Sequence, residues 1–159
     1  MYEMSVGHGS NFLLNIGPDD RGLLPEADRK RLAELGEMIS AYKTPVDYPN
    51  FEQTGENEYS ISVPEEQKQE WKVTPSVGVA NRMALMEDIS DGQRITSFRL
   101  YAYLPAYQHK KILIYEGRTV GHKLICPFGA IRASKYVLEI TGADGAVKLR
   151  DMKAYYVKS

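Results

Sequence analysis

Two hydrophobic patterns divide the chain. Residues 12–16 (FLLNI) form an almost continuous apolar run between glycines and a Gly-Pro-Asp-Asp turn. Such a run is typical of a strand buried on both faces, as in a parallel sheet. In residues 25–42, Leu32, Leu35 and Ile39 recur at helical spacing and form one apolar stripe. The N-terminal pattern therefore predicts a strand, a turn and a helix.

From about residue 81 the period becomes alternating. Residues 95–104 place Phe98, Leu100 and Ala102 on one side of a strand, and further alternating runs follow between Glu-Gly, Phe-Gly and Asp-Gly turns. Several short strands at this spacing predict an antiparallel β-sandwich. We expect three parts: a strand–helix unit over residues 1–47, a polar and acidic linker over 48–80, and the sandwich over 81–159.

The predicted N-terminal strand lacks a partner in this sequence. One strand–helix unit cannot form a sheet, so we expect the neighbouring strands to lie in chain upstream of this sequence. A strand with unpaired edges also seeks partners elsewhere. Residues Phe12–Ile16 are therefore a candidate for pairing two copies of the chain into a dimer.

Composition and charge exclude several classes of partner. The chain has 159 residues and a formal net charge of −1. Binding to nucleic acid or an anionic membrane rests on clustered Lys and Arg, so we expect neither partner. No apolar stretch approaches the length that spans a bilayer, and no signal peptide is visible. The sequence leaves the compartment open.

The residues that bind metals or form disulfides are few. Cys126 is the single cysteine, so no disulfide forms within the chain, and we expect a small buried residue there. His8, His109 and His122 show no metal-ligand spacing. We therefore expect no metal site and no cofactor.

Two motifs resemble those of one known family. Residues 9–36 contain Gly-Ser-Asn, the apolar run, Asn-Ile-Gly-Pro, Pro-Glu and Leu-Ala-Glu-Leu-Gly in order. This order resembles the last strand and helix of the catalytic barrel of family 29 glycoside hydrolases, the α-L-fucosidases. Residues 87–94 (EDISDGQR) and 119–123 (TVGHK) resemble motifs of the β-sandwich that follows this barrel. Leu124 and Tyr107 depart from the family, which commonly has Arg and Trp at or near these positions.

The resemblance implies both a fold and a function. The fold is mainly β: a discoidin- or galactose-binding-like sandwich of jelly-roll type, preceded by one strand–helix unit from the end of a (β/α) barrel. The parent reaction is retaining hydrolysis of terminal α-L-fucosyl linkages, which needs two carboxyl groups about 5 Å apart. In the family, these carboxyl groups come from earlier barrel strands. We therefore expect no catalytic residue in this chain, and no activity from it alone. The parent would be periplasmic, secreted or lysosomal.

Two carboxylate pairs are candidates for structural roles. On a strand, Glu87 and Asp88 would point to opposite faces, and we expect them to bond Arg94 or backbone N–H groups where the sandwich turns. Asp19 and Asp20 follow the predicted strand, on what would be the catalytic rim of a barrel. A turn between strand and helix favours Asp for its own reasons, so we expect the turn role.

Sugar binding by the sandwich is the alternative function. Discoidin-like sandwiches often bind sugars through loops at one end, with an aromatic ring and polar donors, so fucosylated glycans are candidate partners. Aromatic residues at alternating positions, such as Tyr155 and Tyr156, are more typical of sheet packing. A third reading is an assembly element that binds no ligand. The candidate ligand-binding residues are Trp71, Arg94, Tyr103, Tyr107, Arg118 and His122.

Overall fold

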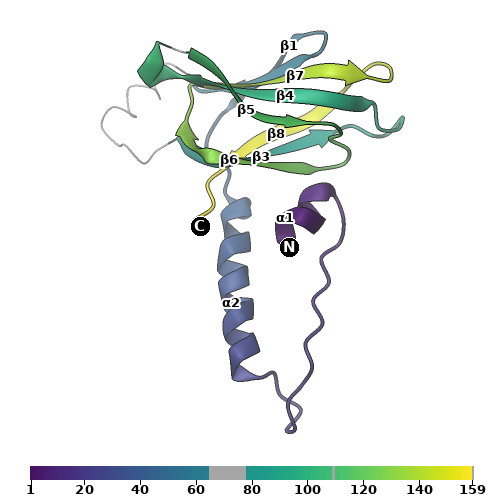
Figure 1. Cartoon of the computed structure of the whole chain (residues 1–159), viewed down its shortest axis with the longest axis vertical. Helices are drawn as coiled ribbons and strands as arrows, with labels where there is room; N and C mark the ends of the chain where they lie inside the picture. The colour runs from purple at the N-terminus through teal and green to yellow at the C-terminus, as the bar shows by residue number, and fades with distance from the viewer. Residues whose placement is uncertain (65–77, 109, 159) are drawn as a thin grey trace.

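The sandwich prediction is confirmed. The computed structural model describes residues 1–64, 78–108 and 110–158. In this part of the chain, two antiparallel sheets face each other and a helical unit projects from one of them (Figure 1). The five-stranded sheet has the order β1-β2-β7-β4-β5, and the three-stranded sheet has the order β6-β3-β8.

The elements follow the chain in a simple order. The N-terminal unit comprises α1 (Tyr2–Ser5), the 3₁₀ turn η1 (Val6–His8), α2 (Glu26–Ser40) and the 3₁₀ turn η2 (Ala41–Lys43). The strands are β1 (Asn50–Gly55), β2 (Glu58–Ser62), β3 (Val79–Glu87), β4 (Ile95–Leu104), β5 (Lys110–Gly117), β6 (Leu124–Arg132), β7 (Lys135–Ala143) and β8 (Leu149–Tyr155), with the 3₁₀ turn η3 (Pro105–Tyr107) between β4 and β5.

The core lies between the two sheets and comes from the alternating positions. Phe98, Leu100 and Ala102 of β4 are fully buried, as the sequence pattern predicts. Side chains from every strand of the three-stranded sheet meet them from the opposite side. The buried residues of that sheet include Met83, Leu85, Leu124, Cys126, Met152 and Ala154. Interdigitation of two inner faces is the ordinary source of stability in a sandwich.

The sandwich begins earlier than the sequence pattern indicates. Residues 50–62, which we expected in the linker, form the β1–β2 hairpin, and β2 pairs with β7. All six residues of β1 are exposed, so its sequence shows no inward-facing alternation. β2 contributes Tyr59 and Ile61 to the core.

In the N-terminal unit, the predicted helix is present, but the predicted strand is an unpaired extended segment. Pro25 precedes α2, and acidic residues occupy the first turn of this helix. Residues 12–16 run as an extended segment outside either sheet, and Leu13 is 91% exposed. A strand is defined by hydrogen bonds to a neighbour, and these residues pair with no strand of the described chain. Figure 1 shows α2 and this segment leading away from the sandwich to the turn at residues 17–24.

Candidate functional site

The Glu-Asp motif at residues 87–88 closes one end of the sandwich. Glu87 is only 1% exposed. Its Oε1 accepts hydrogen bonds from the backbone N–H groups of Arg94 (2.6 Å) and Ile95 (3.0 Å), and its Oε2 accepts one from the N–H of Gly121 (3.1 Å). The backbone N–H of Glu87 donates to the Gly121 carbonyl (3.0 Å). The carboxylate therefore ties the β3–β4 turn to the Thr-Val-Gly loop, which confirms its predicted structural role.

Two of the other three candidate carboxylates hold turns. Asp88 Oδ1 accepts hydrogen bonds from the backbone N–H (3.1 Å) and hydroxyl (2.5 Å) of Ser90, which lower the pKa of Asp88. Asp19 accepts hydrogen bonds from the Arg21 guanidinium and from the backbone N–H groups of Arg21 and Leu23, and these lower the pKa of Asp19. Asp20 is exposed. Asp19 therefore holds its turn, as expected.

The predicted sugar-binding residues do not form one cluster. β4 begins beside the loop that follows β5, because Phe98 pairs with Gly117, and it ends where Leu104 pairs with Lys110. Three of the candidates lie toward the first end of the sandwich and two toward the second. The first set is Arg94, Arg118 and His122; the second is Tyr103 and Tyr107. Trp71 lies outside the described residues.

Two of these side chains have structural contacts. The Arg94 guanidinium donates to the carbonyls of Asp91 (2.8 Å) and Asp144 (3.2 Å), so it joins the β3–β4 and β7–β8 loops. His122 lies against Gly9, where an added Cβ would be 3.4 Å from the His122 Cβ. Tyr107 is 67% exposed. Sugar binding by this set stays a prediction.

The N-terminal unit docks on the outer face of the three-stranded sheet. Tyr2 of α1 and Tyr42 of η2 pack against a small cluster formed by Ala84, Ile125 and Tyr155. The ring of Tyr42 lies 5.4 Å from that of Tyr2 and 5.4 Å from that of Tyr155, centroid to centroid. We call this contact the junction. It positions the helical unit on the sandwich.

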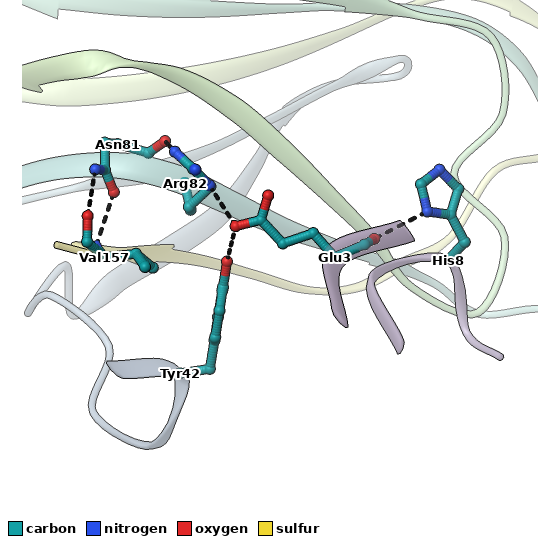
Figure 2. A network of polar contacts seen from close by, with 6 residues as sticks. All are labelled: Glu3, His8, Tyr42, Asn81, Arg82 and Val157. Atoms are coloured by element: carbon teal, nitrogen blue, oxygen red, sulfur yellow. Dashed lines mark hydrogen bonds and ion pairs between the residues drawn. The ribbon is translucent and has the colours of Figure 1, made fainter. Parts of the chain in front are cut away.

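A polar network crosses the junction (Figure 2). One oxygen of Glu3, Oε1, accepts a hydrogen bond from Arg82 Nε of β3 (2.7 Å) and another from the Tyr42 hydroxyl. Burial raises the pKa of Glu3, but the hydrogen bonds from Tyr42 and Arg82 outweigh it, so its pKa is lowered. Burial and the neighbouring Glu3 raise the pKa of Tyr42. Glu3 is therefore a carboxylate and Tyr42 a neutral donor at neutral pH.

Sequence reasoning missed this network. Glu3 and Arg82 are 79 positions apart, and no spacing motif joins them. The one available signal was Tyr42, which extends the apolar stripe of the helix beyond its end. A tyrosine at that place suits a position with an apolar ring contact and a polar hydroxyl contact.

The described residues show no further reactive centre. They contain no group of three or more His, Cys, Asp and Glu side chains that could hold a metal ion. Burial raises the pKa of the Cys126 thiol, so this thiol is protonated and unreactive at neutral pH. No helix among these residues is long and apolar enough to cross a membrane.

Comparisons with known proteins agree with the sequence motifs. No protein-family model matches the chain. A curated rice protein (Oryza sativa subsp. japonica) that carries the name of an α-L-fucosidase is 26% identical over 165 residues, which cover 90% of this chain and 31% of the rice protein. A solved structure from Bacteroides ovatus, also titled as an α-L-fucosidase, is 28% identical with a TM-score of 0.80. It covers 99% of this chain.

The chain is similar to the C-terminal part of family 29 α-L-fucosidases. A glycoside hydrolase family 29 member from an unknown rumen bacterium shares the fold, with 21% identity and a TM-score of 0.78. This chain spans 26% of the B. ovatus fucosidase and 28% of the rumen protein. Because both solved structures match 99% of the chain, they share the helical unit as well as the sandwich.

Proposed function

We propose that this chain is the non-catalytic C-terminal part of an α-L-fucosidase-like glycoside hydrolase, whose sandwich supports the catalytic barrel. The parent reaction would be retaining hydrolysis of terminal α-L-fucosyl linkages. The chain's similarity to α-L-fucosidases over less than a third of their length supports this proposal.

One observation favours a supporting role over a catalytic one. The sandwich contacts the N-terminal unit through Glu3, Gly7 and Gly9, which precede the extended segment 12–16, and through Tyr42, which follows α2. The turn at residues 17–24 lies at the far end of the unit (Figure 1). Barrel active sites form at the carboxyl ends of the strands. In such a barrel, the sandwich would attach at the end of the strand opposite the reaction.

The extended segment would complete the barrel sheet. Its run of Phe, Leu, Leu and Ile suits a strand covered on both faces, and the described chain offers no strand beside it. The upstream barrel is therefore the partner that we propose for residues 12–16. Pairing of two copies through the same residues is the alternative. A dimer by light scattering that becomes monomeric on Leu14→Asp would favour the alternative.

A chimera tests the proposal. The C-terminal part of the B. ovatus fucosidase would be replaced by this chain, with a truncated version lacking that part as the control. We expect the truncated enzyme to lose hydrolysis of an aryl α-L-fucoside and the chimera to regain it. Full activity of the truncated enzyme would contradict a supporting role.

A further inference from the structure

A groove lies between the end of α2 and the chain that follows β8. Its volume is about 460 Å³. It is lined by Glu34, Glu37, Met38, Ser40, Ala41, Tyr156 and Lys158. We call it the Tyr156 groove. None of the residues that the sequence predicts for sugar binding is among these lining residues.

Tyr156 presents its ring to this groove. Its neighbours Tyr155 and Val157 are buried, whereas Tyr156 is 45% exposed. Successive side chains of an extended chain point to opposite sides, so the burial of Tyr155 and Val157 directs Tyr156 away from the sandwich. The same alternation therefore buries Tyr155 against the sandwich and leaves Tyr156 on the surface.

Two adjacent residues of β3 anchor the chain next to the groove, and Figure 2 shows their contacts. The Asn81 amide donates to the Val157 carbonyl (2.8 Å) and accepts from the Val157 N–H (2.9 Å), which holds the chain just after Tyr156. Just before it, Tyr155 pairs with Arg82 between β8 and β3. Arg82 holds Glu3, and Glu3 holds Tyr42, which lies two residues beyond the end of α2. Both walls are therefore anchored to the same strand. A groove formed in advance lowers the ordering cost of binding.

The lining suits a neutral, polyhydroxylated ligand. An exposed aromatic ring can stack on the apolar face of a sugar, and carboxylates and an ammonium can accept from and donate to its hydroxyls. Glu37 and Lys158 form no ion pair with any described residue, so both are available, whereas Glu34 already bonds Arg31 (2.7 Å). Charges of both signs favour a neutral ligand over an anion or a cation. The two hollows at the first end of the sandwich have no aromatic residue in their lining and cannot stack a ring.

We propose that the Tyr156 groove binds a neutral oligosaccharide, with a sugar ring on Tyr156 and hydroxyls bonded to Glu37 and Lys158. This site differs from the one predicted from sequence, since it uses the helix and the chain's C-terminal segment in place of the sandwich loops. The site is inferred from the chemistry of its lining residues. Only the choice of a fucosylated probe rests on the proposed function.

Titration of the ¹⁵N-labelled 159-residue chain by NMR tests this site. The probes are fucosyllactose and lactose, each added to tens of millimolar. We expect saturable shifts of the backbone amides of Ala41, Tyr156 and Lys158. Tyr156→Ala should weaken binding about tenfold, as loss of one stacking contact does. Glu37→Gln should weaken it several-fold.

The matched control is Phe51→Ala, which removes an exposed aromatic ring of β1 outside the groove and should leave binding unchanged. Unchanged amide dispersion would show that each variant is folded. Binding of both sugars would support a site for neutral glycans, and binding of fucosyllactose alone would add a preference for fucose. No shift with either sugar, or shifts that Tyr156→Ala leaves intact, would overturn the proposal. The chimera experiment measures hydrolysis and does not depend on Tyr156. Either proposal can therefore be refuted without the other.

Discussion

Replacing Glu87 with Ala should remove much of the stability of the sandwich. The change deletes the acceptor of three backbone N–H groups, of which that of Ile95 is buried and those of Arg94 and Gly121 are partly buried. A hydrogen bond to a charged group contributes about 1.5–3 kcal/mol, and a buried donor left without a partner costs about 1–3 kcal/mol. Water can reach the two partly buried donors. We therefore expect a loss of about 3–5 kcal/mol in the free energy of unfolding.

Urea denaturation followed by circular dichroism measures this loss. A single domain of this size has a total stability of about 5–15 kcal/mol, so Glu87→Ala should unfold at a much lower urea concentration or fail to fold. The urea midpoint of Glu87→Gln should fall between those of Glu87→Ala and the wild type. It keeps the side-chain shape, but its amide offers one acceptor oxygen and places an NH₂ group where a second acceptor is needed.

Asp88→Asn is the control, because Asp88 is adjacent in sequence and its hydrogen bonds to Ser90 are exposed. Its urea midpoint should stay close to that of the wild type. A Glu87→Ala variant within about 0.5 kcal/mol of the wild type would refute the assignment of Glu87 as the residue that closes this end of the sandwich.

Three further predictions follow from single contacts. The pKa of Glu3 lies below its ordinary value of 4.5, so ionised Glu3 stabilises docked α1 above that pH, and this contribution is lost as the pH falls through the lowered pKa. Hydrogen-exchange protection of that helix should therefore fall in acid, and at neutral pH it should be lower in Glu3→Gln than in the wild type. Equal protection in the wild type at neutral pH, the wild type in acid and Glu3→Gln would contradict the network. Gly117→Ala places a Cβ 2.6 Å from Cζ of the buried Phe98 and should cost about 1–3 kcal/mol by thermal melting, whereas Gly129→Ala meets nothing within 4 Å and should not. Cys126 should resist thiol reagents in the folded chain and react in urea, and fast labelling without urea would show that the thiol is accessible.

The sequence was most informative where the pattern is local. The alternation around Phe98 and Leu100 predicts β4 and its inward face, and the 3.6-residue period predicts α2. The hydrophobic pattern did not predict β1, because all its residues are exposed and its place in the sheet depends on pairing with β2. Exposed edge strands have little sequence signal, since their stability comes from the neighbour and not from burial.

Long-range contacts explain the remaining differences. The Glu3–Arg82 ion pair joins residues that only the folded chain brings together, so no spacing along the sequence indicates it. The burial of Tyr155 and exposure of Tyr156 depend on which face of the chain meets the sandwich. The candidates Arg94 and Tyr107 separate for the same reason, since residues at opposite ends of β4 lie at opposite ends of the sandwich.

Hydrolysis of an aryl α-L-fucoside by the purified 159-residue chain tests the central claim most directly. The account predicts no turnover above a blank, because Asp19 and Asp88 hold turns, Glu87 closes the sandwich, and the proposed function places the two carboxyl groups of retaining hydrolysis on other strands of the barrel. Turnover that survives repurification and disappears on Asp20→Asn would contradict the account and place a catalytic group within this chain.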